Sequence, residues 1–473
     1  MRILWLHQYF ATPAGWGSVR TYEFGRRFVA AGHAVDVLCC AAYDPSLEGR
    51  GVVETAGMRV HVSRTHYRPQ MGFLARVGSF LAFAGFAIGQ VLRRGREYDL
   101  IIASSSPLTM AIPALLARWV HGTPFVFEVI DVWPDAAIEA GVLRNPLLRW
   151  MAFRLESCAY RHASRIVTCS PGMTERILRK GEDRATGWRS HIFGTLWERH
   201  PVARKNKVIT IPNCCDLDVF RPDSARRTAV RAALGVRDDQ FVVLYTGAMG
   251  RSNAVDDIVQ AAEQLAGDAQ FVWWFAGDGA EEGKLRQVAA GRVFGSLPRE
   301  RVVDLCQAAD AVLVTFMHAP LFQENSPNKF FDAIAAGLPV IFNRSTWLET
   351  EIEQYECGFV CTGGKPGPGA RPGSTTGRRE KHTPEASQSS ALQMDISQEA
   401  GMEGRVPASP FAHAMAARLR QLADDPVLRA RMGAGARRLA EERFPRDKLA
   451  EQYLEVCRES THEIRERECN FFA

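Results

Sequence analysis

The chain has 473 residues, of which 46% are hydrophobic and 23% charged, the composition of a globular protein. Because this length exceeds what a single hydrophobic core usually serves, we expect two domains. The net charge is only +5, from 58 basic and 53 acidic residues, and this near balance argues against nucleic acid as a main partner.

The eleven cysteines include the adjacent pairs Cys39–Cys40 and Cys214–Cys215. Their spacing matches neither a zinc site nor a disulfide framework, so we interpret them as core residues of a protein in a reducing compartment. The N-terminus enters a strand-like run at once, without the regions of a signal peptide. We therefore expect no secretion by that route.

The first half of the chain alternates strand and helix patterns, which predicts a parallel sheet. Residues 3–6 form the first predicted strand, and a loop containing Gly15 and Gly17 leads from it into a helix over residues 19–31. The loop lacks the G-x-G-x-x-G pattern, which argues against a nicotinamide cofactor. Further strands are expected at residues 34–39, 58–62, 99–103, 124–130, 164–170 and 208–212.

Residues 73–92 are the most apolar stretch of the chain, and Arg93, Arg94 and Arg96 follow it. The stretch is long enough to span a bilayer, but Arg76, Gln90 and several glycines argue against a span. Two interpretations stay open. The helix lies in the interface of an anionic membrane, with its arginines on the lipid, or it is a core helix of the first domain.

The strand at residues 124–130 is followed by Asp131 and Asp135. Carboxylates at the carboxyl end of a parallel strand stand where open sheets bind ligands. Asp131 is our candidate for contacting a substrate hydroxyl, whereas Asp135 is expected only to cap the next helix.

Two segments interrupt the pattern. Residues 181–206 are polar and basic, and we interpret them as an inserted surface loop. Residues 363–410 are rich in Gly, Pro, Ser and Gln, a composition that cannot bury enough apolar surface to offset the entropy of ordering. We expect a disordered insert that the chemistry does not require.

A strand at residues 241–245 opens the second half and leads into a loop with Gly247, Gly250 and Arg251. Strands are expected at 271–276, 293–295 and 311–315, with Gly277 and Gly295 at the ends of the first two, and helices from residues 411 and 448.

The stretch Glu324-Asn-Ser-Pro-Asn-Lys-Phe-Phe-Asp332 is the one around which the chain is organised. Ser326 and Pro327 predict a helix start, and Gly337 predicts its end. Lys329 would face the positive end of the helix dipole, which is unfavourable unless an anion such as phosphate lies between them. An ordinary amphipathic helix explains the apolar residues of the stretch but not the cap, charge and spacing together.

The stretch resembles the Glu-x7-Glu signature of family 4 retaining glycosyltransferases with the GT-B fold. Its S-P-N-K-F-F-D part resembles the fucosaminyltransferase-like branch of bacterial surface-polysaccharide assembly. The resemblance implies that Glu324 contacts the donor sugar, Lys329 the diphosphate and Asp332, in place of the second Glu, the ribose hydroxyls. The segment from Glu128 to Pro134 resembles the E-x-x-D-x-W-P of that branch, which faces the cleft between the domains.

The resemblance implies an α/β protein with two facing Rossmann-like domains and the active site between them. We expect an acceptor domain over residues 1–221, a nucleotide-sugar domain over 222–447, and a C-terminal helix over 448–473 that crosses back to the first domain.

The implied reaction is transfer of a sugar, with retention, from a nucleotide-diphosphate donor to a glycan or polyprenyl-linked acceptor in O-antigen, capsule or exopolysaccharide biosynthesis. We expect a UDP-sugar, no metal or cofactor, and a cytoplasmic protein peripheral on the inner membrane. The expected catalytic residues are Glu324, Lys329 and Asp131; the expected donor-binding residues are Gly15, Gly17, Gly247, Gly250, Arg251, Gly277, Gly295, Asn328, Lys329 and Asp332.

Three functions other than glycosyl transfer share parts of this pattern. Paired carboxylates also occur in glycosidases, but here the same stretch carries phosphate donors, which argues against hydrolysis of a glycoside. A GT-B sugar-nucleotide epimerase or phosphorylase, and a membrane-docked GT-B scaffold without activity, stay open.

Overall fold

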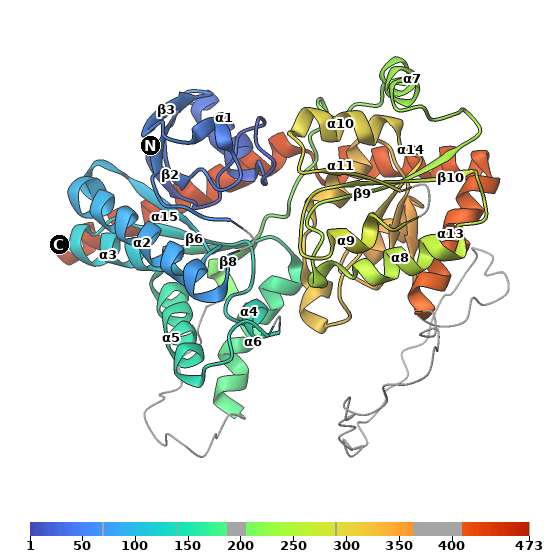
Figure 1. Ribbon diagram of the computed structural model, residues 1–473. Helices are drawn as coiled ribbons and strands as arrows, with labels where there is room; N and C mark the ends of the chain where they lie inside the picture. Colours follow the sequence, from blue (N-terminus) through green and yellow to red (C-terminus); the bar gives the residue numbers. More distant parts are fainter. Residues whose placement is uncertain (69–70, 140, 187–204, 289–290, 363–408, 473) are drawn as a thin grey trace, which may run out of the picture.

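The computed structural model describes residues 1–68, 71–139, 141–186, 205–288, 291–362 and 409–472. They form two α/β halves that lie side by side, each with helices packed on both faces of a central sheet (Figure 1). The predicted insert at residues 363–410 lies outside the described residues except for its last two. Of the insert predicted at 181–206, residues 181–186 continue a helix, and most of the rest also lies outside.

The first half is built on an eight-stranded sheet of order β3-β4-β2-β1-β5-β6-β7-β8. All its pairs are parallel except β3 with β4, an antiparallel pair that the sequence patterns missed at β3. The parallel strands were predicted because both of their faces are covered, so they read as continuous apolar runs. The strands are β1 (Arg2–Leu6), β2 (Ala34–Cys40), β3 (Val52–Thr55), β4 (Met58–Ser63), β5 (Leu100–Ser104), β6 (Phe125–Val129), β7 (Arg165–Thr168) and β8 (Val208–Thr210).

The second half is built on a six-stranded, fully parallel sheet of order β11-β10-β9-β12-β13-β14. Its strands are β9 (Phe241–Thr246), β10 (Phe271–Ala276), β11 (Gly291–Gly295), β12 (Ala311–Val314), β13 (Val340–Phe342) and β14 (Gly358–Val360). With the first sheet, this confirms the predicted pair of Rossmann-like sheets.

Helices connect the strands in both halves. Those of the first half are α1 (Arg20–Ala30), α2 (Phe73–Arg94), α3 (Ala111–His121), α4 (Asp135–Glu139), α5 (Pro146–His162) and α6 (Pro171–Thr186). Those of the second half are α7 (Ser224–Ala233), α8 (Val255–Gln264), α9 (Glu282–Leu285), α10 (Arg299–Ala308), α11 (Asn328–Ala335), α12 (Glu349–Gln354), α13 (Pro410–Asp424) and α14 (Pro426–Arg443).

The last helix, α15 (Arg446–Phe472), leaves the second half and runs along the first (Figure 1). Its Tyr453 is fully buried among the rings of Trp5, Phe24 and Phe28, at centroid distances of 5.5–5.8 Å. At the start of the helix, Arg446 forms ion pairs with Glu23 of the first half and Asp216 of the connection between the halves. The helix therefore ties the two halves together with both apolar and charged contacts.

Helix α2 is half core and half surface. Phe83, Ala87 and Val91 are completely buried in the first half, whereas Leu74 is 82% and Leu81 57% exposed. Among the described residues, one helix, Leu74–Glu97, is long and apolar enough to cross a membrane by length and composition, and 33% of its most apolar window is buried. The interpretation of α2 as a core helix therefore accounts for its buried apolar side chains and not for the exposed ones on its other side.

Candidate active site

Two glycine loops of the second half meet at the carboxyl ends of β9 and β10. Gly247 and Gly277 have φ angles of +113° and +140°. Residues that carry a side chain rarely adopt such angles. A Cβ added to Gly277 would lie 1.9 Å from the carbonyl oxygen of Gly247. Only glycine permits this approach, so the two predicted donor-loop glycines lie against each other at one point of the sheet edge.

Lys329 reaches this point from the first turn of α11. A Cβ added to Gly247 would lie 3.6 Å from the lysine Nζ, which also stands 3.9 Å from the centroid of the Tyr245 ring. The Nζ is buried, and within the described part of the chain no group forms a hydrogen bond with it. Burial lowers the pKa of Lys329 to about 7, because an enclosed amine is stable as a cation only when an anion compensates it.

Helix α11 begins differently from the prediction. It starts at Asn328, with Pro327 at the cap position and no side-chain cap. The Oγ of Ser326 instead accepts a hydrogen bond from the Asn213 backbone N–H at 3.3 Å, and the Ser326 carbonyl accepts one from Asn213 Nδ2 at 2.6 Å. The prediction of a serine cap was wrong because a residue of the connection between the halves takes up this serine. The first-turn N–H groups of α11 are therefore not used by a side-chain cap. The predicted end is confirmed, since Gly337 lies just beyond α11 at φ +69°.

Glu324 is held by the other half of the molecule. Both its carboxylate oxygens accept hydrogen bonds from Arg176 of α6, from Nε and one terminal nitrogen, each at 2.7 Å. A Cβ on Gly172 would lie 2.7 Å from Glu324 Cγ, so a glycine of α6 also makes room for this side chain. Bidentate pairs of this kind fix orientation as well as charge.

Asp332, on the next turns of α11, is also paired. Its Oδ1 accepts a hydrogen bond at 3.1 Å from Arg299, the first residue of α10. Burial raises the pKa of Asp332, and the charges of Arg299 and Arg446 oppose that shift. The expected ribose contact thus competes with an existing ion pair.

Asp131 lies at the carboxyl edge of the first sheet. Its Oδ2 accepts a hydrogen bond of 2.6 Å from the Ser106 hydroxyl, at the end of β5. The residue is exposed. The surrounding protein atoms nevertheless raise the pKa of its carboxyl group, whereas the hydrogen bond from Ser106 lowers that pKa. By contrast Glu128 is fully buried and bound to Arg20 and Ser104, so it is a structural residue.

The remaining predicted residues have various positions. Gly15 and Gly17 pack against Tyr43. A Cβ added to Gly15 would lie 2.5 Å from the Tyr43 backbone carbonyl oxygen, and one added to Gly17 would lie 2.9 Å from the Tyr43 Cβ. The close approach of the chain segments therefore already explains both glycines. Asn328 is exposed at the first residue of α11, and Arg251 is exposed just beyond the β9 loop. Around Gly250 and Gly295 an added Cβ would meet nothing within 4 Å.

Sequence reasoning missed Arg176 and Arg299, the two cations that hold the predicted carboxylates. Neither stands in a motif, and their distances in sequence from Glu324 and Asp332 leave no local signal. Lys180 was missed in the same way; it pairs with Asp135 and with the buried Glu156. Across the described ranges, no group of three or more His, Cys, Asp or Glu side chains is arranged to hold a metal ion.

Two family models match the chain. Residues 17–186 match the "Glycosyl transferase 4-like domain" and residues 240–369 match "Glycosyl transferases group 1". The first match includes strands β2 to β7 of the first sheet, and the second includes all six strands of the second sheet, with the Gly247 and Gly277 loops and the stretch around Lys329.

Relatives and solved structures agree with these models. The probable glycosyltransferase WbjE of Pseudomonas aeruginosa is 26% identical over 282 residues, 57% of this chain and 63% of that protein. The putative teichuronic acid biosynthesis glycosyltransferase TuaC of Bacillus subtilis is 28% identical over 34% of this chain and 40% of that protein. The chain thus spans less than two thirds of the length of these relatives. The HepE protein of Anabaena, solved with UDP-glucose, superposes with a TM-score of 0.62 over 97% of this chain and 99% of its own, at 16% identity. This likeness shows the GT-B fold.

Proposed function

We propose that this chain, which belongs to the family 4 glycosyltransferases with the GT-B fold, transfers a sugar from a nucleotide-diphosphate donor to a glycan or lipid-linked acceptor. The observation that carries the proposal is the amino group of Lys329, enclosed beside the Gly247 loop without a hydrogen-bond partner. A buried cation without a partner is costly. A diphosphate bound between this loop and the N-terminus of α11 would supply the missing anion.

The residues of this half suit a departing diphosphate. As the bond between the anomeric carbon and the diphosphate oxygen breaks, negative charge grows on that oxygen, and Lys329 and the first N–H groups of α11 stabilise it. The acceptor hydroxyl forms the new bond on the same face of the sugar. Its proton passes to the departing diphosphate, so the anomeric configuration is retained and no protein base is required.

Three carboxylates are proposed to orient the sugar groups of the substrates. Glu324, whose carboxylate is fixed by Arg176 of the first half, is assigned the contact with the donor sugar. Asp131 stands on the first half and is open to solvent, where it accepts from an acceptor hydroxyl. Asp332 holds the ribose hydroxyls only when its bond to Arg299 loosens.

We infer a UDP-sugar as donor and a cell-surface polysaccharide as product. Support for uracil as the base of the donor comes from HepE, which has the same fold and was solved with UDP-glucose. Support for the product comes from the Bacillus subtilis relative, whose name places that protein in teichuronic acid biosynthesis. The expected assignment to a fucosaminyltransferase-like branch stays a proposal.

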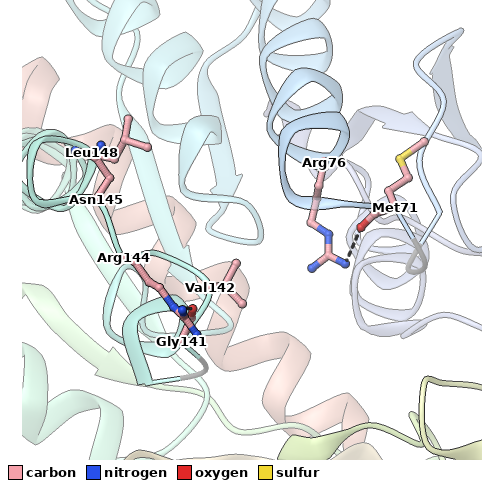
Figure 2. Close-up of a pocket in the computed structure, with 7 residues that line it drawn as sticks. All are labelled: Met71, Arg76, Gly141, Val142, Arg144, Asn145 and Leu148. Carbon is pink, nitrogen blue, oxygen red and sulfur yellow. Dashed lines mark hydrogen bonds between the residues drawn. The ribbon is translucent and has the colours of Figure 1, made fainter.

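A lipid-linked acceptor is supported by a pocket of the first half. The pocket has a volume of about 560 Å³ and lies between the start of α2 and the connection from α4 to α5. Figure 2 shows Arg76 on one side and Arg144 on the other, with Met71, Val142 and Leu148 between and around them. The guanidinium of Arg144 beside the apolar side chains of Met71, Val142 and Leu148 suits an anionic group attached to a hydrocarbon chain.

Two helices of the first half expose apolar side chains that we together call the α2–α5 surface: Leu74 and Leu81 of α2, and Leu147, Trp150 and Met151 of α5. These side chains are 52–82% exposed. Arg93, in the last turn of α2, and Arg96, just after it, are also exposed. We propose that this surface rests on anionic lipid at the cytoplasmic face of the inner membrane, because an exposed apolar face with basic residues beside it favours such an interface.

Two experiments test these proposals. Thermal unfolding is measured with UDP, GDP, CDP and ADP; UDP should raise the midpoint most, since a ligand of the native state stabilises it, and the absence of any shift would contradict donor binding. Liposomes with anionic lipid should pellet the protein in low salt and release it in high salt. The double variant Leu74→Asp/Leu81→Asp should abolish pelleting, whereas Val427→Asp, a change at an equally exposed position of α14, should not.

A further inference from the structure

Five aromatic side chains stand in a row at one edge of the first sheet. Ring centroids are 5.5 Å apart for Tyr9 and Tyr43, 4.9 Å for Tyr9 and Tyr67, 6.0 Å for Tyr67 and Phe80, and 6.4 Å for Phe80 and Trp133. We call this set the aromatic row. Figure 1 shows the sheet strands and α2 that carry it.

The row follows the carboxyl ends of the parallel strands. Tyr9 comes after β1, Tyr43 after β2, Tyr67 after β4 and Trp133 after β6, while Phe80 joins them from α2. These strands lie in the order β4-β2-β1-β5-β6, so residues distant in sequence gather at one edge. Open α/β sheets bind ligands at this edge.

The row is not a closed core. Tyr9, Tyr43, Tyr67 and Trp133 each keep part of their surface accessible, and only Phe80 is buried, at 8% exposure. Burial raises the pKa of Tyr43, and the neighbouring Tyr67 raises it further. The charge of Asp278, which follows β10, adds to that shift. Tyr43 therefore lies near enough to the second half to experience a charge from its donor loops.

One end of the row reaches the acidic group of the first half. The backbone N–H of Trp133 donates to the Asp131 carbonyl oxygen at 3.0 Å. The Asp131 carboxylate beyond it is bound by Ser106. Aromatic faces, phenol hydroxyls and a solvent-accessible carboxylate are thus combined along one edge.

This combination fits one chemical class. A pyranose ring has faces of apolar C–H groups and a rim of hydroxyls, so it can stack on aromatic rings while its hydroxyls bond to carboxylate and phenol groups. A nucleotide is a poorer match, because the diphosphate-binding lysine and glycine loops belong to the second half.

We propose that the aromatic row is a binding platform for a pyranose ring of the acceptor, with Asp131 placed to receive a hydroxyl of that ring. The identification of this ring as part of the acceptor rests on the proposed function. Binding of a sugar to the row is independent of transfer and can be measured alone.

The test uses saturation-transfer NMR with methyl α-D-glucopyranoside, methyl α-D-galactopyranoside and methyl α-D-mannopyranoside as probes. Sorbitol, an open-chain polyol without a ring face, serves as the control ligand. Ring protons of at least one glycoside should receive saturation from the protein, and the C–H protons of sorbitol should not. Tyr67→Leu and Trp133→Leu should each reduce the signal more than two-fold.

Matched variants separate stacking from structure. Tyr67→Phe keeps the ring and should keep the signal, because the platform needs the aromatic face. Trp119→Leu removes an exposed tryptophan of α3 that contacts the His162 ring outside the row, and it should leave the signal unchanged. If Trp133→Leu fails to fold, the pair Tyr67→Leu and Tyr67→Phe still decides.

The proposal is overturned if no glycoside gives more signal than sorbitol, or if both leucine variants in folded form keep the wild-type signal. UDP binding, measured by calorimetry on the same samples, reads the donor site separately. Wild-type protein that binds a glycoside but not UDP would contradict the proposed function and leave the aromatic row standing.

Discussion

Two buried cations, Arg20 of the first half and Lys329 of the second, are held in opposite ways. In the first half, Arg20 is 5% exposed and donates to Glu128, to the carbonyls of Ile211 and Pro212, and to Asn213, at 2.7–3.2 Å. In the second half, the enclosed Nζ of Lys329 lies over the ring of Tyr245 and has no hydrogen-bond partner among the residues that the structure describes.

This difference separates structural from functional charges. A fully bonded ion pair is part of the fold, and its removal disturbs the fold. A buried cation that the protein leaves without a partner destabilises the fold, so it is retained for a ligand that supplies the anion. Substitutions on the two sides should therefore have opposite effects on stability and on activity.

Breaking the paired site should have the largest effect on stability. Arg20→Met leaves Glu128 buried without its cation, and losing one partner of a buried pair costs about 3–5 kcal/mol. Urea unfolding should show this loss, while UDP affinity of the folded protein stays unchanged. The double variant Arg20→Met/Glu128→Leu, which buries no charge, should recover part of the stability. Unchanged stability of the single variant would contradict the comparison.

Removing the unpartnered cation should affect catalysis instead. Lys329→Met keeps the length of the side chain but removes the charge from the leaving diphosphate, and loss of one such donor lowers kcat by about 10² to 10³. The free energy of unfolding should stay equal or rise, because no uncompensated amine is buried. Lys284→Met, on an exposed lysine of α9 paired with Asp256, is the control and should change neither quantity. A large loss of stability in Lys329→Met would show that the lysine is structural.

A smaller effect should come from Asp332, whose charge is already paired in the free protein. Asp332→Ala removes the expected ribose contact, and a hydrogen bond to a charged group is worth about 1.5–3 kcal/mol. Because Arg299 competes for this carboxylate, we expect the lower end, a rise of about tenfold in the donor KM with less effect on kcat. Steady-state kinetics with varied donor checks this. A fall in kcat without change in KM would place Asp332 at the reacting centre.

The smallest and most specific expected effect is the uptake of a proton when UDP binds. The pKa of Lys329 is about 7 in the folded protein and 10.5 in its ordinary state. Calorimetry of UDP binding at pH 8.5, in buffers of different ionisation enthalpy, should show uptake of a proton, since the diphosphate restores the charge of the amine. At pH 6 the amine is already charged, and no uptake is expected. Lys329→Met should show none at either pH.

The same pKa fixes the pH dependence of stability. Between pH 7 and 10.5 the unfolded chain holds the lysine proton and the folded chain does not. The unfolded state therefore binds more protons, and the stability of the wild type relative to Lys329→Met should rise with pH through this window. Urea unfolding of both proteins across the window measures it, and parallel curves would contradict an enclosed amine.

Local patterns in the sequence determined most of the fold. Parallel strands covered on both faces give continuous apolar runs, and the run at residues 271–276 coincides with β10. The organising stretch was also local, because Glu324, Lys329 and Asp332 stand on or beside one short helix. The pattern failed at β3, whose side chains are only half covered, and at the Ser326 cap, where the bonding partner is Asn213, more than a hundred residues away.

The sequence by itself therefore determined the two sheets and the glycine loops, and it placed the candidate residues Glu324, Lys329 and Asp332 on or beside one helix, since each of these features depends on neighbours in sequence. Tertiary structure alone decided that Arg176 and Arg299 hold the two carboxylates, that α2 buries one apolar face and exposes the other, and that five aromatic residues from separate segments form one row. Such contacts join residues whose separation in sequence has no fixed value, so no local pattern records them.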